Sequence, residues 1–396
     1  MMELLLLLLP VAAASGWVAA KRGERRERSR AGVQDPAYFK GLNYLLNEQP
    51  DKAIDVFIQM LEVDSDTVET HLALGNLFRR RGEVDRAIRI HQNLIARPTL
   101  SRDHRAQALL ELGKDYLRAG LLDRAENLFQ ELVEGKLYEE QALRNLLTIY
   151  EREKEWNQCL TAAGRLESLT GELLFRQRAH YYCELAEEAL AAKDLALASS
   201  HLKKAQNSDR NCVRASLLLG EIEKERGTYR TAIRIFQRAG EQDPVYLSEM
   251  LPSLTECHRN LGSLKDLRSY LEQLLSKHHG FLEALALTDL IREEEGDAAA
   301  AAFLTNYLQE RPSLEGIDRL LGMPLAGGME SGTEMFRILH RLLERLLEKQ
   351  PTYQCINCGF SAKAMHWQCP SCHTWSSVKP SQALPAANKH AGGATG

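Results

Sequence analysis

Four cysteines near the C-terminus form the strongest chemical pattern in the sequence. Cys355 and Cys358 make one C-x-x-C pair, and Cys369 and Cys372 make a second pair after ten intervening residues. Each C-x-x-C turn brings two sulfurs toward one ion, and backbone N–H groups in the turn can donate to them. The spacing predicts a tetrahedral four-thiolate metal site. Zinc and iron both accept four thiolates, so the pattern leaves the metal open between them.

Two other uses of paired cysteines compete with metal binding. Disulfides need an oxidising compartment, which conflicts with the cytoplasmic placement argued below. A thioredoxin-like redox motif belongs in a βαβ pattern, which this segment lacks. Four cysteines saturate a tetrahedral site, so we interpret His366 and His373 as structural residues. A saturated site has no open coordination position, and we expect it to hold a fold rather than to catalyse hydrolysis.

The segment around these cysteines resembles a short zinc ribbon or a rubredoxin knuckle pair. Gly359 follows the first pair, whereas His373 stands at the corresponding place after the second pair and departs from the usual glycine. So short a module has little apolar material of its own. We expect its small core to consist of four aromatic residues: Tyr353, Phe360, Trp367 and Trp375.

A regular helical pattern fills most of the chain before this module. Alanines mark the period at positions 53, 87, 125 and 232, and a glycine stands twelve residues before each of them. A second glycine stands five residues before the last three, where a turn between two short helices needs it. Cys159 and Ala198 take the alanine position in two degenerate copies. The pattern predicts about eight helix hairpins, with the aromatic residues filling the gaps between successive hairpins.

These hairpins resemble the tetratricopeptide repeat, as in LELGKDYLRAGLLDRAENLFQEL (110–132). Leu, Ala, Glu and Arg, which are strong helix formers, dominate the composition and indicate an all-α fold. A stack of such hairpins forms a right-handed superhelix whose concave surface holds segments of other proteins. A rigid spacer is the alternative use. The four single cysteines (Cys159, Cys183, Cys212 and Cys257) lie in repeat sequence and are interpreted as small buried hydrophobic residues. An amphipathic segment, 333–349, is expected to close the array.

The N-terminus carries an uncharged apolar run over 4–20, followed by a basic cluster. Six basic and two acidic side chains in 21–30 give this segment a charge of +4, which leaves −8 on the rest of a chain whose net charge is −4. The chain is therefore not a general nucleic-acid binder. A cleaved signal peptide would have its basic residues before the apolar run. The observed order favours an uncleaved anchor with everything downstream in the cytoplasm.

These features divide the 396 residues into five parts. We predict a transmembrane anchor over 1–20, a basic juxtamembrane linker over 21–35, the repeat array with its closing helix over 36–350, the metal-binding module over 351–380, and a disordered tail over 381–396. The sequence has no H-E-x-x-H, G-x-S-x-G or P-loop pattern, and we predict no catalytic site.

The anchor MMELLLLLLPVAAASGW, the repeat GNLFRRRGEVDRAIRIHQ and the terminal CINCGF…HWQCPSCHTW together resemble the lipopolysaccharide assembly protein B family of Gram-negative bacteria. The resemblance covers about 1–380. It implies an inner-membrane, non-enzymatic adaptor that promotes degradation of the committed-step UDP-3-O-acyl-N-acetylglucosamine deacetylase by a membrane-anchored AAA+ protease. A lipopolysaccharide-sensing inner-membrane protein is implied as an antagonist. By the same resemblance, Cys355, Cys358, Cys369 and Cys372 are the metal ligands.

Two other functions fit the residues alone. The first is an electron-transfer protein that holds one iron ion in the four cysteine thiolates. This function predicts a reversible redox couple and a redox partner. A general scaffold for envelope-assembly complexes would instead have many stoichiometric partners and no effect on protein half-lives. Without the resemblance, the sequence indicates a membrane-tethered helical-repeat binding protein with a structural metal.

Overall fold

The computed structural model of the chain describes residues 68–381, except 99, 279, 324–332 and 349, together with scattered positions between 39 and 56. The predicted anchor, the basic linker and all but the first residue of the predicted tail lie outside the described residues. Within the described part, no helix is long and apolar enough to cross a membrane. The chain forms two compact units, Met1–Ile149 and Tyr150–Gly396, and each is described by itself.

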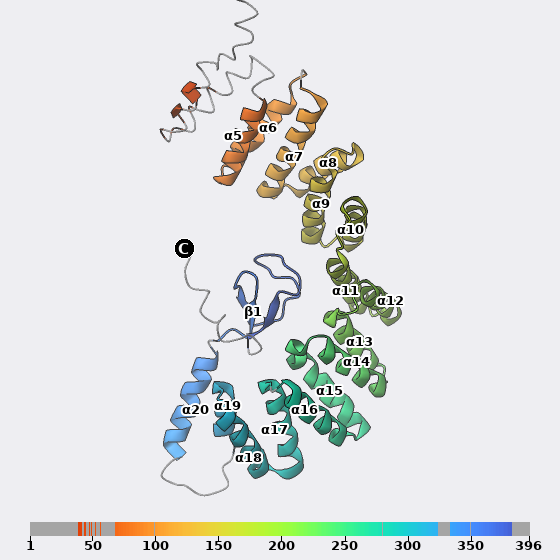
Figure 1. The fold of residues 1–396 in the computed structure, drawn as a ribbon, viewed down its shortest axis with the longest axis vertical. Helices are drawn as coiled ribbons and strands as arrows, with labels where there is room; N and C mark the ends of the chain where they lie inside the picture. The colour runs from red at the N-terminus through yellow and green to blue at the C-terminus, as the bar shows by residue number, and fades with distance from the viewer. Residues whose placement is uncertain are drawn as a thin grey trace, which may run out of the picture. The chain divides into compact units, whose positions relative to one another are not determined.

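Consecutive helices of the first unit pair into hairpins, and successive hairpins pack on one another (Figure 1). Its helices are α5 (Val68–Arg80), α6 (Val84–Ile95), α7 (Arg102–Ala119), α8 (Leu122–Glu134) and most of α9 (Glu139–Glu153). The six residues 96–101 connect α6 to α7.

The second unit continues the same construction and ends in the cysteine module (Figure 1). Its helices are α10 (Trp156–Thr170), α11 (Phe175–Ala191), α12 (Leu195–Ser208), α13 (Val213–Glu225), α14 (Tyr229–Gln242), the short 3₁₀ helix η3 (Pro244–Tyr246), α15 (Leu247–Leu261), α16 (Leu264–His278), α17 (Phe281–Glu295), α18 (Asp297–Glu310), α19 (Leu314–Leu321) and α20 (Thr333–Glu348). Helix α19 was not expected from the sequence. The amphipathic segment 333–349 forms helix α20 over Thr333–Glu348, which contacts α19.

Glycines have two roles within a hairpin, at the turn and at the contact between its two helices. Gly120 has φ +77°, a left-handed conformation that ends α7 and turns the chain into α8. Gly113 lies beneath the ring of Phe129, and Gly220 lies beneath that of Phe236, so that a Cβ at either glycine would fall within 3 Å of the ring. These phenylalanines therefore fill space inside their own hairpin. The expectation that they fill the gaps between successive hairpins was wrong for both, because the missing Cβ creates the space within the pair.

One repeat of the first unit replaces this phenylalanine with a buried polar network. His91 of α6 covers Gly75 as the phenylalanines cover their glycines, and its Nδ1 lies 2.5 Å from a carboxylate oxygen of Asp115 on α7. The other Asp115 oxygen accepts a hydrogen bond from Arg79 at 2.8 Å, and Arg79 also pairs with Glu111 at 2.5 Å. His91 and Asp115 are both fully buried. The network joins two hairpins through charge where other repeats use apolar contact.

The module after α20 is built on three short antiparallel strands. They are β1 (Tyr353–Cys355), β2 (Ser361–Ala362) and β3 (Val378–Pro380), in the order β2-β1-β3. Tyr353 pairs with Ala362 on one side, and Cys355 pairs with Val378 on the other. The rest of the described chain is helical, so the all-α expectation holds for the repeats and not for this module.

Candidate metal centre

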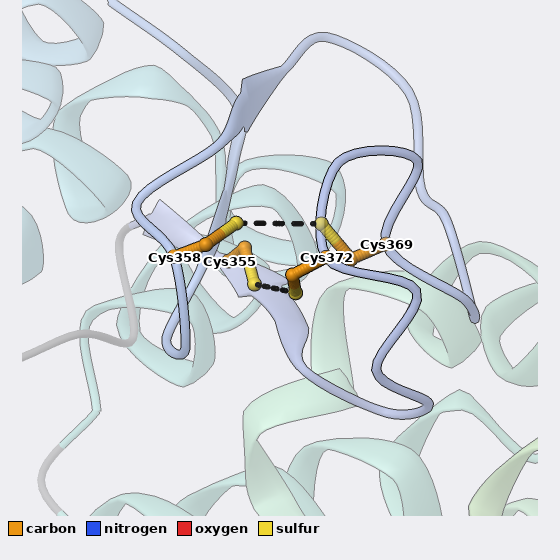
Figure 2. Close-up of side chains that lie close together, drawn as sticks. All are labelled: Cys355, Cys358, Cys369 and Cys372. Carbon is orange, nitrogen blue, oxygen red and sulfur yellow. Dashed lines mark hydrogen bonds between the residues drawn. The ribbon is translucent and has the colours of Figure 1, made fainter. Parts of the chain in front are cut away.

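The four cysteines of the module converge on one point (Figure 2). All four sulfurs lie within 4.8 Å of one another. The Cys355 and Cys372 sulfurs are 3.7 Å apart, as are those of Cys358 and Cys369. Four sulfurs bound to one zinc or iron ion at about 2.3 Å lie about 3.8 Å apart along each edge of a tetrahedron. A disulfide would need about 2.05 Å between sulfurs. The spacing therefore fits a shared ion and not two disulfides.

The two C-x-x-C turns have the same local geometry. The Gly359 N–H donates to the Cys355 carbonyl at 3.0 Å, and the His373 N–H donates to the Cys369 carbonyl at 2.9 Å. Gly359 has φ +77°, and His373 adopts the same left-handed region at φ +55°. His373 thus replaces the usual glycine without changing the turn, at the cost of strain that a non-glycine residue bears there.

Polar neighbours favour the thiolate form at two of the cysteines. The Thr374 hydroxyl and the Asn357 amide lie 3.4 and 3.5 Å from the Cys372 sulfur, and they lower the pKa of that thiol to about 5. Burial raises the pKa of the Cys355 thiol, but the nearby Ser377 hydroxyl and backbone N–H groups outweigh it, so the net pKa is lowered. Metal binding needs thiolates, and these groups help to supply them.

The module is seated on the repeats of the second unit through aromatic stacking. Trp375 stacks on His180 of α11, with ring centroids 4.8 Å apart and planes 16° from parallel. His180 is 4% exposed, and its Nε2 lies 2.7 Å from the Ser376 hydroxyl. Trp375 also meets Trp156 edge-on at 6.3 Å. Burial, and secondarily the charge of nearby Arg214, lower the pKa of His180 to about 3, so this imidazole is neutral.

Glu151, in the last turn of α9, accepts hydrogen bonds both from the module and from the repeats. One of its carboxylate oxygens accepts from the Trp375 indole N–H at 3.0 Å and from the Tyr181 hydroxyl at 2.6 Å. The other accepts from the Gln368 side chain at 2.9 Å. A charged acceptor that satisfies an indole N–H fixes the orientation of the ring as well as its depth.

A second group of contacts holds the far edge of the module. Trp367 lies 5.1 Å from the Tyr246 ring, with the Arg214 guanidinium 5.8 Å from its own centroid. Lys379 pairs with Asp243 at 2.7 Å and lies over the Tyr246 ring at 4.2 Å. The Tyr353 hydroxyl donates to Glu249 at 2.7 Å. The module therefore contacts residues from α9 to α15 and is part of the second unit.

The contact between the module and the repeats shows that the expectation of a four-residue aromatic core was wrong for two of its members. Tyr353 and Phe360 do pack against the buried residues of the module, which are Cys355, Cys369 and Val378. Trp367 and Trp375 instead face the repeats. A module of about thirty residues has too little interior to surround an indole ring, whereas the repeat helices supply a surface large enough to cover two. One feature of the sequence indicated that the module packs on another surface. Its two tryptophans are more than so small a core can bury.

The four cysteines outside the module are buried, which confirms their interpretation as small buried residues. Cys159 and Ala198, the proposed stand-ins for the repeat alanine, have no exposed surface. Burial raises the pKa of the Cys159 thiol far above its usual value. Cys183 and Cys212 lie with their sulfurs 3.9 Å apart on neighbouring hairpins, a pairing that their sequence separation did not reveal.

A groove on the second unit lies apart from the metal centre. It has a volume of about 870 Å³ and runs between α15 and α17. Apolar side chains of Leu251, Leu282 and Leu285 line it, with Arg259 and Arg319 among its charged residues. Pro252 lies inside α15 at the groove, and the helix continues through it to Leu261. The groove thus combines apolar surface with the paired charges Arg259–Glu293 and Arg319–Asp289.

Comparisons with known proteins match these features. Residues 353–380 match the family described as rubredoxin metal binding domain, and residues 70–106 match the tetratricopeptide repeat. The chain is 39% identical to lipopolysaccharide assembly protein B of Escherichia coli strain K12 over 97% of this chain and 99% of that protein. It is 36% identical to the protein of that name from Haemophilus influenzae, over 96% and 98% of the two chains.

Among solved structures, MamA protein is similar at 21% identity and a TM-score of 0.33, covering 47% of this chain and 96% of that one. The two curated relatives are matched nearly from end to end, through the repeats and through the four-cysteine module alike. On that evidence, the chain belongs to the lipopolysaccharide assembly protein B family.

Proposed function

We propose that this chain is a non-enzymatic adaptor of the bacterial inner membrane. It regulates lipopolysaccharide biosynthesis by promoting degradation of the committed-step deacetylase by a membrane-anchored AAA+ protease. The observation that carries the proposal is the match to lipopolysaccharide assembly protein B over nearly the whole of both chains. A lipopolysaccharide-sensing membrane protein acts as its antagonist.

In this proposal Cys355, Cys358, Cys369 and Cys372 hold one zinc or iron ion. The ion cross-links the two C-x-x-C turns and supplies the folding energy that the small module lacks. Supporting this structural role, four sulfurs at tetrahedral spacing leave no open coordination position for a substrate. The chain's own residues keep the module on the repeats, with Glu151 and His180 at the centre of the contact.

The groove between α15 and α17 is the proposed contact for a segment of a partner protein. An Ala286→Arg substitution places a long charged side chain in the groove. We expect it to reduce co-purification of the deacetylase, or of the protease, at least severalfold. Ala302→Arg, at an exposed position of α18 away from the groove, is the matched control and should bind as the natural chain does. Equal binding by all three chains would remove the groove from the proposal.

The test of the function itself is the half-life of the deacetylase after depletion of this chain, with protein synthesis blocked and the protease left intact. The proposal predicts a markedly longer half-life. Re-expression of the natural chain should restore rapid turnover, whereas Cys355→Ser should not. An unchanged half-life on depletion would contradict the proposal and leave the scaffold or electron-transfer alternatives, which the metal content and redox activity of the purified chain then separate.

A further inference from the structure

Two cysteines outside the metal centre form a buried pair between neighbouring hairpins of the second unit. Cys183 lies on α11, and Cys212 is the residue that precedes α13. Their sulfurs are 3.9 Å apart, within reach of an S–H···S hydrogen bond, and both residues belong to one apolar cluster. A disulfide holds its sulfurs about 2.05 Å apart, so the two sulfurs need to approach by only about 2 Å to form one.

The two thiols have unequal surroundings. Cys183 is fully buried, and burial raises the pKa of its thiol. Cys212 is 5% exposed and ends a surface turn at the N-terminus of α13. The Cys183 thiol, as hydrogen-bond donor, and the Ala215 N–H lower the pKa of the Cys212 thiol, and the positive charge of Arg214 acts in the same direction. Cys212 is therefore the better nucleophile of the pair, and Cys183 is placed to react with it afterwards.

The pair also lies beside the two points from which the repeats hold the metal-binding module. His180 precedes the first cysteine of the pair by three residues on α11 and stacks on Trp375. Arg214 follows the second cysteine by two residues on α13, and its guanidinium lies 5.8 Å from the centroid of the Trp367 ring. A covalent link between the two cysteines would fix the spacing of the two helices that contact these tryptophans.

We infer that Cys183 and Cys212 are a redox-active dithiol, which hydrogen peroxide oxidises to a disulfide. The Cys212 thiolate attacks one peroxide oxygen, the O–O bond breaks, and hydroxide leaves, which makes a sulfenic acid. The Cys183 thiol attacks that sulfur, the S–O bond breaks, and the departing hydroxide takes the Cys183 proton to form water. The first hydroxide and the proton that Cys212 lost form a second water. Two thiols are thus oxidised to one disulfide while one peroxide is reduced to two waters.

This chemistry is compatible with a reducing cytoplasm and does not depend on the proposed function. Disulfides in such a compartment are usually transient and redox-sensing, so the resting state of the pair is the dithiol. A disulfide would close the segment 184–211 into a loop, which restricts the unfolded chain more than the folded one. We therefore expect oxidation to make the contact between the module and the repeats harder to open.

The first test exposes the full metal-loaded chain to hydrogen peroxide, blocks the remaining thiols with an alkylating agent and identifies disulfide-linked peptides by mass spectrometry. We expect the Cys183–Cys212 disulfide in the natural chain and its loss after dithiothreitol. Cys257→Ser is the matched control, because it removes a buried thiol that lies in a different apolar cluster. It should form as much of the disulfide as the natural chain. No disulfide above the untreated chain, or a disulfide of either cysteine with another partner, would overturn the inference.

The order of attack is tested with dimedone, which traps sulfenic acids. Cys183→Ala removes the second thiol, so the dimedone adduct at Cys212 should rise at least fivefold above that of the natural chain. Cys212→Ser keeps a residue that favours a helix N-terminus and should give no adduct at Cys183. The metal content and circular dichroism of each variant report whether it is folded. An adduct at Cys183 in Cys212→Ser, or no rise at Cys212 in Cys183→Ala, would contradict the roles assigned to the two thiols.

The structural effect is measured by denaturant unfolding of the oxidised and reduced chains, followed by tryptophan emission. The shift to longer wavelength should need more denaturant after oxidation of the natural chain. The same peroxide treatment of Cys212→Ser should not raise its midpoint, which controls for oxidation at other side chains. An unchanged or lower midpoint in the oxidised natural chain would contradict the stabilising effect of the disulfide.

Discussion

The buried His180 gives the second unit a defined pH dependence. The module keeps this imidazole neutral, and its Nδ1 has no hydrogen-bond partner among the described residues. The pKa of His180 is about 3 in the folded chain and about 6.5 in the unfolded chain. As the pH falls, the unfolded chain therefore binds a proton at His180 before the folded chain does. Stability is therefore complete above about pH 6.5 and falls as the pH drops toward 3.

A His180→Phe substitution keeps a ring against Trp375 and removes the titration. Lowering the pH from 7.5 to 5 should cost the natural chain about 2 kcal/mol more than the variant. Denaturant unfolding at the two pH values, followed by tryptophan fluorescence, measures that difference. The metal site titrates equally in both chains and cancels. Equal losses of stability would mean that His180 is not held neutral.

Asp115 is the residue on which the polar network of the first unit depends. An Asp115→Ala substitution leaves His91 buried without its carboxylate and deprives Arg79 of one partner. We expect this to destabilise the unit by about 3–5 kcal/mol, the usual cost of breaking a buried ion pair. Arg144→Ala removes one partner of the exposed Arg144–Glu140 pair and should cost only about 0.3–0.5 kcal/mol. Hydrogen exchange measures the first effect at the α5 and α7 amides and the second at the α9 amides, and similar values would show that the network is not a source of stability.

At the scale of helices, two glycines inside helices have opposite roles. A Cβ at Gly220 would lie 2.4 Å from Phe236, whereas a Cβ at Gly164 of α10 would meet nothing within 4 Å. Gly220→Ala should therefore destabilise the α13–α14 hairpin by about 1–3 kcal/mol through overpacking. Gly164→Ala should stabilise α10 by about 0.8–1.0 kcal/mol through helix propensity. Hydrogen exchange in each hairpin distinguishes them, and a stabilising Gly220→Ala would contradict the packing described.

The periodic residues made these helices predictable. Glycine and alanine at fixed spacing determine where two helices approach and where the chain turns, and both requirements are local. Helix α19 escaped prediction because it is only eight residues long. The ring positions of Phe129 and Phe236 also depend on three-dimensional packing, which spacing alone does not assign to the inside or outside of a hairpin.

The four-cysteine site was predictable because its geometry is also local. The surface of the repeats on which the module packs was not predictable. Two C-x-x-C turns carry their geometry in their spacing. Glu151 and His180 lie about two hundred residues from the tryptophan that they contact, and nothing in the sequence pairs them. The excess of tryptophan in the module indicated that it needs a partner surface, without saying which helices supply it.

At the scale of the module, metal removal should release the two tryptophans together. Without the ion the four sulfurs have no cross-link, and so small a sheet does not hold itself folded. We expect a strong chelator to shift tryptophan emission to longer wavelength as Trp367 and Trp375 enter water. Cys355→Ser should show the same shift without chelator. An unshifted spectrum after verified metal loss would mean that the contacts with the repeats hold the module without the ion.

At the scale of the whole molecule, the proposed adaptor combines a membrane tether, a partner-binding array and a metal-held module. Such an adaptor should stimulate degradation when the protease, the deacetylase and this chain are the only proteins present. The most direct measurement is the rate of deacetylase degradation by the AAA+ protease in reconstituted membranes, with and without this chain. We expect a rate at least several times higher with the natural chain and no increase with Cys355→Ser. An equal rate with and without the natural chain, with ATP-dependent cleavage of a control substrate intact, would contradict the adaptor function.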